Sequence, residues 1–513
     1  MKGSESVLST AAAAGMRVCF ANPGTTEMAL VEAFDATTGI RPVLALAEGV
    51  VTGAADGYTR MAGVPALTLL HLGPGFANGI ANLHNARRGR TPLVNLIGEH
   101  ASWHQAADAP LASDIDSLAA PVSGWVGRTT SAARAAEEFA AARQAALRDR
   151  MPATLICAAD HMWSDGGVEV AVPEPPAPPA VAPERIEEVA KLLAGAARPA
   201  LLLGGDALDA EGLRTAARIA AAVGAEVFAE RSPARLERGP DIPAVRSVPY
   251  FPEDVLDALD GFSDLVLVGT GTPVAFFGYQ GLPSFPVPDG TAVHPLADKG
   301  DDVRGALRAL AEAAGAAATA PTAPPRPGPT APSGALDAPA VAAAIALTQP
   351  DGAIVVNEGV SSGGAYPAAA TGAPAHTELT LTGGAIGSGM PMATGAAIAC
   401  PDRAVIGFQA DGSAAYTAQA LWTQAREELD VTTVICANQR YRILEAELRR
   451  AGVDEPGPGA TSMTRLAGPV LDWTAIARGF GVPGVRVSTG EELLDALRRA
   501  HAEPGPHLIE AVL

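Results

Sequence analysis

An acid and an amide follow two apolar segments in the last third of the chain. Asp411 comes directly after the apolar segment 403–410, and Asn438 comes after the apolar segment 431–437. About 27 residues separate them, enough for a helix and a returning strand, and a right-handed crossover would bring the two strand ends together. Carboxylate and amide oxygens suit Mg²⁺, which commonly completes its shell with phosphate oxygens and water. The spacing therefore predicts a Mg²⁺ site that also binds a phosphate group.

The three residues after Asp411 could complete that phosphate site. Gly412 lets the backbone approach a diphosphate, and Ser413 and Ala414 would present N–H groups at the start of a helix expected over 417–429. The alternative interpretation is a surface Asp-Gly turn with an unrelated asparagine, because Asp-Gly is a common turn pair.

A second group of polar residues lies in the first third of the chain. Glu48 ends an apolar segment and begins a Gly- and Ala-rich helical stretch, so its carboxyl group should be partly desolvated and suited to sharing a proton. The alternative for Glu48 is an acid that stabilises a helix N-terminus. Thr25 and His71 also follow apolar segments, and His100 and His104 follow another. For the last two residues, a structural role is as consistent with the sequence as a place in a pocket.

Parallel α/β sheets would bring these side chains together. Short apolar runs alternate with amphipathic helical stretches along the whole chain, which is typical of doubly wound parallel sheets. Two Pro-rich segments, 172–184 and 320–332, are expected to be extended linkers. We therefore predict three doubly wound domains, at 1–168, 185–316 and 335–513. Ligands of such sheets bind at the carboxyl ends of the strands.

Composition limits the possible partners. Of the 513 residues, 48% are hydrophobic and 18% are charged, as expected for a globular protein with a large core. The net charge of −20 argues against nucleic acid as a partner. The sequence has no apolar run of membrane-spanning length and no secretion signal, which predicts a cytoplasmic protein without a membrane partner. Its four cysteines are widely spaced and are expected to be free thiols.

The metal motif resembles that of a known enzyme family. The sequence Ala410-Asp411-Gly412 followed by Asn438 resembles the Gly-Asp-Gly…Asn signature of thiamine-diphosphate-dependent enzymes, a family that includes acetolactate synthase and benzoylformate decarboxylase. Ala410 replaces the first glycine of the signature. The resemblance implies thiamine diphosphate and Mg²⁺ as cofactors, with Asp411, Asn438 and the backbone carbonyl of Arg440 as metal ligands.

The resemblance extends over nearly the whole chain and implies further cofactor contacts. Glu48 is similar to the family's indispensable acid, which hydrogen-bonds the pyrimidine ring of the cofactor bound by the neighbouring subunit. A homodimer or homotetramer with sites at the subunit interface is therefore implied. Gly384 would offer its carbonyl to the cofactor's amine, Ile386 would hold the cofactor bent, and Ser361 would contact the diphosphate.

The segments 21–27 and 70–75 are similar to the substrate-binding pattern of benzoylformate decarboxylase. By this resemblance Thr25 would touch the substrate carboxylate and His71 would relay protons, since imidazole titrates near neutrality. The alternative for His71 is inert packing behind a glycine turn. The decarboxylase's second histidine is absent, because Gly278 stands in the corresponding segment. The glutamine typical of acetolactate synthases after the equivalent of Asp108 is also absent.

Taken together, the resemblance implies a lyase or transferase that decarboxylates or ligates small 2-oxo acids, similar to acetolactate synthase. A non-oxidative decarboxylase similar to benzoylformate decarboxylase is the first alternative. A flavin-linked oxidoreductase similar to pyruvate oxidase is the second, although FAD is not expected because the middle third has no recognisable flavin-binding residues. A protein that keeps only the fold would be expected to have lost Glu48 or Asp411, and both are present.

Overall fold

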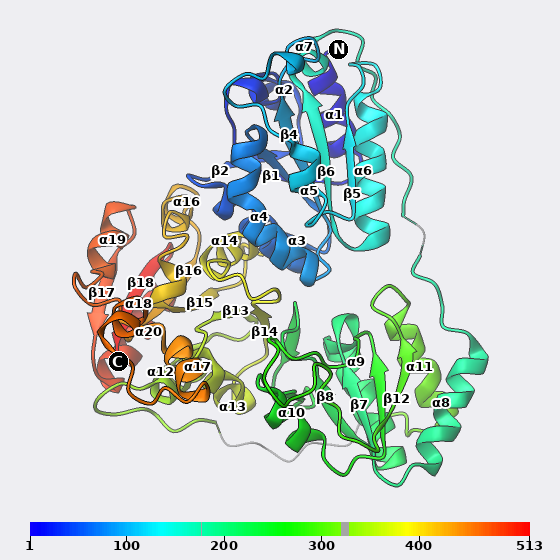
Figure 1. Ribbon diagram of the computed structural model, residues 1–513, viewed down its shortest axis with the longest axis vertical. Coiled ribbons are helices and arrows are strands. Elements are labelled where there is room, and N and C mark those ends of the chain that lie inside the picture. The colour runs from blue at the N-terminus through cyan, green and yellow to red at the C-terminus, as the bar shows by residue number, and fades with distance from the viewer. Residues whose placement is uncertain (176, 320–327) are drawn as a thin grey trace. The chain divides into compact units, whose positions relative to one another are not determined.

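The structure is a computed structural model that describes residues 1–175, 177–319 and 328–513. The chain forms two compact units. Unit 1 consists of three segments: 1–175, 329–370 and 381–513. Unit 2 consists of two segments: 176–328 and 371–380. Each unit is described by itself below, with the element labels of Figure 1.

Six parallel strands form the sheet of the N-terminal segment, in the order β2-β1-β3-β4-β6-β5. They are β1 (Val18–Asn22), β2 (Arg41–Leu44), β3 (Ala66–Leu70), β4 (Leu93–Glu99), β5 (Trp125–Arg128) and β6 (Pro152–Ala158). The helices are α1 (Gly3–Ala13), α2 (Met28–Ala36), α3 (Glu48–Ala62), α4 (Leu72–Arg88), α5 (Ile115–Ala119), α6 (Ala135–Asp149) and α7 (Ala159–Trp163). Apolar side chains of α1, α2 and α6 pack on alternate strand residues, because successive residues point to opposite faces. Helices α3 and α4 contact the same strands from the other face (Figure 1).

The C-terminal part of unit 1 contains a second parallel sheet, in the order β17-β18-β16-β15-β13. Its strands are β13 (Ala353–Glu358), β15 (Val405–Ala410), β16 (Val431–Ala437), β17 (Gly484–Val487) and β18 (His507–Val512). Its helices are α12 (Ala338–Thr348), α13 (Tyr366–Ala369), α14 (Gly389–Ala399), α15 (Asp411–Ala414), α16 (Ala420–Arg426), α17 (Arg442–Arg450), α18 (Pro458–Thr464), α19 (Trp473–Gly479) and α20 (Gly490–Ala502).

Unit 2 is built on a parallel five-stranded sheet, in the order β10-β8-β7-β11-β12. These strands are β7 (Pro199–Leu203), β8 (Glu226–Ala229), β10 (Arg246–Ser247), β11 (Asp264–Val268) and β12 (Ala292–Ala297). Its helices are α8 (Pro183–Gly195), α9 (Ala210–Val223), α10 (Pro252–Leu259) and α11 (Val303–Ala313). In addition, β9 (Leu236–Arg238) pairs antiparallel with β14 (His376–Thr380).

This architecture confirms the predicted α/β class with doubly wound parallel sheets. The domain boundaries stay predictions, and the expected linkers 172–184 and 320–332 lie partly outside the described residues. Helix α8 begins at Pro183, inside the first expected linker, because proline fits the first position of a helix, where no N–H partner is needed. Among the described residues, no helix combines the length and apolar character that a bilayer span requires.

Helices α3 and α14 cross in close contact within unit 1. A Cβ atom on Gly57 would lie 2.1 Å from the carbonyl oxygen of Met392, and one on Gly395 would lie 1.8 Å from the carbonyl oxygen of Ala54. Any side chain at either glycine would therefore collide with the backbone of the other helix. This contact joins the helix that begins at Glu48 to the helix that follows the Gly-rich turn.

Candidate active site

Asp411 lies where β15 ends, beside the loop that follows β16. Residues Ala410 and Cys436 are paired in the two parallel strands, so the next residues of both strands emerge together. The buried Asp411 carboxylate accepts hydrogen bonds from the N–H of Gly412 (2.8 Å, Oδ1) and the N–H of Gln439 (2.6 Å, Oδ2). The structure thus brings Asp411 to the loop that carries Asn438, as the crossover argument predicts.

The charge of Asp411 is not balanced by a basic residue. Burial raises the pKa of the Asp411 carboxyl above its ordinary value, although backbone N–H groups oppose this shift. In the described part of the chain, no lysine, arginine or histidine forms an ion pair with Asp411. A bound cation would supply the missing positive charge, since buried charges are normally paired or bind a metal. The environment of Asp411 therefore fits Mg²⁺.

Asn438 and Arg440 flank a residue with unusual backbone geometry. Gln439 has φ +57°, a left-handed conformation that is uncommon for residues other than glycine. The side-chain oxygen of Asn438 accepts the N–H of Arg440 at 3.0 Å. No cluster of three or more His, Cys, Asp or Glu residues suited to a metal occurs in the described chain. The site would therefore consist of one carboxylate, one amide and a backbone carbonyl.

The residues after Asp411 form a shorter helix than predicted. Helix α15 is a single turn, and α16 starts separately at Ala420, so the continuous helix expected over 417–429 is wrong at its start. Ser413 is buried, and its hydroxyl donates to the carbonyl oxygens of Glu358 (3.2 Å) and Ala410 (3.0 Å). Ser413 and Ala414 follow the end of β15 as expected, but they are the last two residues of a single helical turn and do not begin a long helix.

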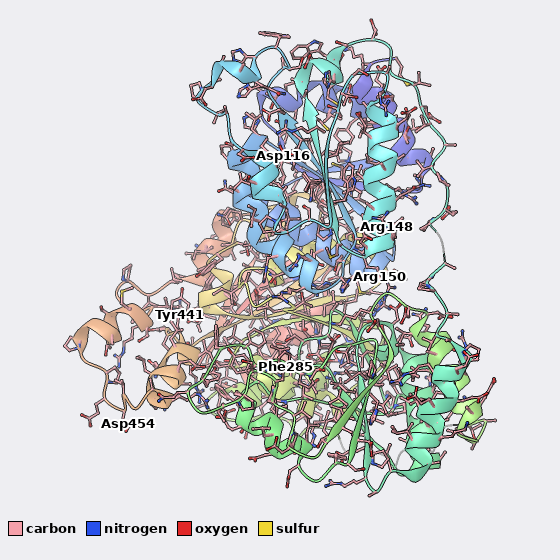
Figure 2. All side chains as sticks on the ribbon, turned by 45° about the vertical axis from the view of Figure 1, so that its right-hand side comes forward. Asp116, Arg148, Arg150, Phe285, Tyr441 and Asp454 are labelled. Atoms are coloured by element: carbon pink, nitrogen blue, oxygen red, sulfur yellow. The ribbon has the colours of Figure 1, made fainter. Side chains whose placement is uncertain are left out.

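An aromatic ring covers Gly412. A Cβ atom on Gly412 would lie 2.5 Å from the ring of Tyr441, which follows β16 and is labelled in Figure 2. The N–H of Tyr441 donates to the carbonyl of Thr464 (2.7 Å), and the N–H of Leu466 donates to the carbonyl of Gln439 (2.8 Å). The Pro- and Gly-rich segment that includes α18 therefore folds back onto the loop beside Asp411.

Glu358 is a polar residue of this region that the sequence analysis missed. Its fully buried carboxylate accepts the N–H groups of Gly387 and Ser388 (both 3.0 Å), the Ser388 hydroxyl (3.1 Å) and the N–H of Gly389 (2.8 Å). Burial raises the pKa of Glu358, against the opposing effect of these donors. Glu358 thus holds the start of α14 against the end of β13. Ser361, which was predicted to contact the diphosphate, is exposed nearby.

The Gly-rich turn before α14 presents the two residues that were expected to contact the cofactor. Gly384 is exposed and Ile386 is partly buried. Gly384 and Gly387 have φ values of +79° and +95°, so the chain bends there in conformations that favour glycine.

Glu48 is the first residue of α3. Its side chain is partly exposed, and its Oε2 accepts a hydrogen bond from Nδ2 of Asn78 on α4 at 3.2 Å. A Cβ atom on Gly75 would lie 3.3 Å from the other carboxylate oxygen of Glu48. The acid is therefore positioned between the first turns of two helices, with one oxygen held by an amide.

His71 is paired with a buried acid that the sequence analysis did not single out. The Nδ1 atom of His71 lies 2.7 Å from Oε2 of Glu27 and 3.3 Å from the hydroxyl of Thr26. Glu27 is completely buried and also accepts the N–H of Gly24 (2.7 Å) and the Thr26 hydroxyl (2.6 Å). Thr25 is exposed, so Thr26 rather than Thr25 contacts the imidazole. The imidazole of His71 is thus held by a hydrogen bond to a buried carboxylate.

Two glycines leave the space in which this pair lies. A Cβ atom on Gly24 would lie 2.3 Å from the ring of His71, and one on Gly98 would lie 1.5 Å from Oε1 of Glu27. The only local indication of this pair in the sequence is therefore the two glycines, one in the loop after β1 and one near the end of β4. Their role became visible only when the fold placed β1, β3 and β4 side by side.

His100 and His104 lie close to each other at the end of β4. Their ring centroids are 5.4 Å apart, and Trp103 beside them is 74% exposed. The Nε2 atom of His100 is buried and has no hydrogen-bond partner among the described residues. No third metal ligand joins the two histidines in the described chain.

The sequence matches two thiamine pyrophosphate enzyme profiles. The N-terminal TPP binding domain matches residues 1–119, and the C-terminal TPP binding domain matches residues 362–511. A Mycobacterium tuberculosis protein, IlvX, provisionally named as an acetolactate synthase large subunit, is 50% identical over 100% of this chain and 99% of its own. Benzoylformate decarboxylase from Pseudomonas aeruginosa is 32% identical, with 97% of this chain and 96% of its own covered.

A solved structure agrees with these matches. The thiamine diphosphate-dependent 4-hydroxybenzoylformate decarboxylase of Rhodococcus jostii RHA1 superposes with a TM-score of 0.87 and 27% identity, covering 99% of this chain and 98% of its own. None of these three relatives is named as a flavin-linked oxidoreductase. With a 50% identical relative matched over its full length and both cofactor-binding domains recognised, the chain belongs to the thiamine pyrophosphate (thiamine diphosphate) enzyme family.

Proposed function

We propose that this enzyme uses thiamine diphosphate and Mg²⁺ to decarboxylate or ligate small 2-oxo acids, similar to an acetolactate synthase. The observation that carries the proposal is the buried Asp411 carboxylate, which has no basic side-chain partner in the described chain and lies beside the loop of Asn438, in a chain of this family. Bound thiamine diphosphate would supply a nucleophilic carbon for the 2-oxo group and an electron sink for the loss of CO₂.

The residues at the ends of β15 and β16 would hold the cofactor's charged end. The Asp411 carboxylate, the Asn438 amide oxygen and the Arg440 carbonyl would bind Mg²⁺, because hard oxygen ligands suit this ion. The backbone of Gly412, Ser413 and Ala414 and the exposed Ser361 would contact the diphosphate. Gly384 and Ile386 would contact the cofactor's rings.

Side chains at the ends of the strands of the N-terminal sheet would hold and transfer protons. Glu48 would hold a proton at the cofactor's pyrimidine ring, and Asn78 supports this role by fixing one carboxylate oxygen. His71 would move a proton to or from the substrate, since imidazole can act as both donor and acceptor near neutral pH. The buried Glu27 would hold the ring of His71 in place. Thr25 would contact the substrate carboxylate.

A non-oxidative decarboxylase similar to benzoylformate decarboxylase is the second candidate. The pairing of His71 with Glu27 favours it, because a positioned imidazole could protonate a decarboxylated substrate to release an aldehyde. A panel of aliphatic and aromatic 2-oxo acids with added thiamine diphosphate and Mg²⁺ distinguishes the two. Aldehyde alone supports the decarboxylase, and a 2-hydroxy ketone or acetohydroxy acid supports the ligating enzyme.

We further infer a homodimer or homotetramer with active sites at the subunit interface, and a cytoplasmic location. The oligomer is supported by the resemblance of Glu48 to an acid that reaches a neighbouring subunit's cofactor. The location is supported by Cys19, Cys157 and Cys436, which are buried free thiols. Light scattering of the purified protein tests the oligomer.

Replacing the proposed activating acid is the direct test of the mechanism. Glu48→Gln should lower kcat by about 1,000-fold or more while leaving thiamine diphosphate binding within a few-fold of wild type, because the amide cannot share a proton in the same way. Glu32→Gln, an exposed acid on α2, is the matched control and should behave like wild type. Full activity of Glu48→Gln on every 2-oxo acid turned over by wild type would refute the assigned role.

A further inference from the structure

We propose that Asn85 on α4 is a positioning residue that fixes the Gly-rich turn 383–387 in the shape required to hold the cofactor. This inference rests on the proposed function, because the turn carries Gly384 and Ile386. Asn85 touches neither reacting atoms nor cofactor in this proposal, and it acts through the backbone of the turn.

The side chain of Asn85 holds one residue of the turn, Ala385, through both its backbone N–H and its backbone carbonyl. Its Oδ1 accepts the N–H of Ala385 (3.2 Å), and its Nδ2 donates to the carbonyl of Ala385 (2.7 Å). The same Nδ2 donates to Oδ1 of Asn82 (3.0 Å). Asn85 is completely buried, so water does not compete for these hydrogen bonds. Ala385 lies directly between Gly384 and Ile386, so this clamp orients both neighbours.

Asn82 extends the contact to the far end of the turn and to the helix of Glu48. Its Nδ2 donates to the carbonyl of Gly49 (2.7 Å) and, at 3.4 Å, to the carbonyl of Gly387. The Gly387 carbonyl also accepts the hydroxyl of Thr417 (2.8 Å). The pair of asparagines therefore connects the peptide that follows Glu48 with the turn before α14.

The near end of the turn is held by the same part of α4. The hydroxyl of Thr382 donates to the carbonyl of Asn85 (2.7 Å) and accepts a hydrogen bond from Arg60 (3.0 Å). Nε2 of His84 lies 3.1 Å from the carbonyl of Gly383. Residues 382 to 387 thus contact α4 at four positions along the turn.

The turn needs such a clamp because its sequence is permissive. Glycine at 383, 384 and 387 allows many backbone conformations, so the turn has little preference of its own. An asparagine can both accept from the N–H and donate to the carbonyl of one residue, whereas aspartate can only accept when ionised and leucine can do neither. At position 85 the side-chain type therefore decides whether the turn keeps one conformation.

The isosteric variant Asn85→Asp tests the inference. It removes the donor to the Ala385 carbonyl and places an acceptor against it. We expect the dissociation constant of thiamine diphosphate, measured by titration calorimetry with excess Mg²⁺, to rise by about tenfold or more, the cost of one to two buried hydrogen bonds. In the cofactor-free protein, hydrogen exchange of the 383–389 segment should become faster. The half-saturating cofactor concentration should rise more than kcat at saturating cofactor falls.

Asn95→Asp is the matched control. Asn95 is equally buried in the same sheet domain, accepts the Thr68 hydroxyl (2.8 Å) and donates to the Thr154 hydroxyl (3.1 Å), but it does not contact the turn. This variant should lose thermal stability while keeping cofactor affinity and segment exchange. If it weakened the cofactor as much as Asn85→Asp, or if Asn85→Asp kept wild-type affinity and exchange, the inference would be wrong.

Two further outcomes separate the possible failures. If wild type does not bind thiamine diphosphate, the proposed function fails, and the exchange of 383–389 still decides whether Asn85 orders the turn. If Asn85→Asp does not fold, the milder Thr382→Val, which removes one hydroxyl from the same interface, takes its place. It should raise the dissociation constant about threefold, and an unchanged value would overturn the inference.

Discussion

Backbone conformations with positive φ occur in both compact units, but among the described residues only unit 1 has residues other than glycine in them. In unit 2 every described position of this kind is a glycine: 205, 224, 261, 269, 281, 290 and 315. In unit 1 seven described residues other than glycine have positive φ: Leu72, Arg90, Asp108, Arg150, Val360, Glu428 and Gln439. Three of the seven flank candidate active-site residues, since Leu72 follows His71, Val360 precedes Ser361 and Gln439 follows Asn438. Such strained residues persist only where surrounding contacts enforce them, and they cluster at functional sites.

Two acids at the ends of strands show the same contrast. Glu358, the last residue of β13, is fully buried and is held only by N–H and O–H donors, with no basic partner in the described chain. Glu230 after β8 in unit 2 is partly exposed and pairs with Lys299 (2.9 Å) and the Thr270 hydroxyl (3.1 Å). At this strand end in unit 2, the acid therefore pairs with a lysine. At the strand end in unit 1, the acid is buried without a basic partner in the described chain, and backbone residues with positive φ lie beside the candidate site.

Among variants that test the contrast between the two units, the largest effect is expected from Gly98→Ala. The new methyl group would occupy the position of the Glu27 carboxylate and push it away from His71. We expect kcat to fall by about 100-fold or more, the usual contribution of a positioned acid or base. Gly271→Ala in unit 2 is the control, because a Cβ atom there has nothing within 4 Å. If steady-state kinetics showed equal activity for Gly98→Ala and Gly271→Ala, the candidate site would not depend on the space that Gly98 leaves in unit 1.

A smaller, pH-dependent effect is expected from Glu358→Gln. Burial raises the pKa of Glu358 above its ordinary value of 4.5, so the folded state binds the proton more tightly than the unfolded state. Stability from this group is fully present below pH 4.5 and is lost as pH rises through the raised pKa. The difference in free energy of unfolding between wild type and Glu358→Gln should therefore shrink as pH increases.

Denaturant unfolding at several pH values measures this slope. Glu230→Gln is the comparison in unit 2 and should cost about 1 kcal/mol or less, and less again at high salt, as expected for a partly exposed ion pair. A Glu358→Gln difference that grew with pH would contradict the assigned effect of burial.

The smallest effect is expected on thermal stability, from substitutions at one positive-φ residue in each unit. Gln439→Gly relieves a left-handed conformation and should stabilise unit 1 by about 1 kcal/mol, the strain released minus the entropy cost of glycine. Gly205→Ala, at φ +51° in unit 2, should destabilise by about 1 kcal/mol. Thermal unfolding of both variants measures the two shifts, and a destabilised Gln439→Gly would show that the left-handed residue of unit 1 is not strained.

Much of the fold could be predicted because strands and crossovers leave local signals. The apolar run 93–99 coincides with β4, since it is bounded on both sides by polar or turn residues. The approach of Asp411 to the loop of Asn438 follows from the handedness of the crossover between β15 and β16. In both places, the features that determine the structure, the bounds of an apolar strand and the handedness of a crossover, can be recognised in the sequence itself.

The features of the fold and site that could not be predicted depend on contacts between segments that are distant in the sequence. The helix expected over 417–429 starts only at Ala420, and the hydroxyl of Thr417 hydrogen-bonds the distant carbonyl of Gly387. Glu27 resembles an ordinary acid at a helix start, and only the fold places His71 and Gly98 beside it. No local pattern identifies Asn85 as the partner of a turn that lies about 300 residues later. Tertiary hydrogen bonds of this kind override local propensity.

The glycine crossing of α3 and α14 has a consequence for biosynthesis. Its two halves are separated by roughly 340 residues, so at translation rates of about 5–20 residues per second the N-terminal half waits on the order of 20–70 s for its partner. During that interval the small-residue surface of α3 around Gly57 remains uncovered on the nascent chain. The first 175 residues therefore complete this contact only after the ribosome has made most of the protein.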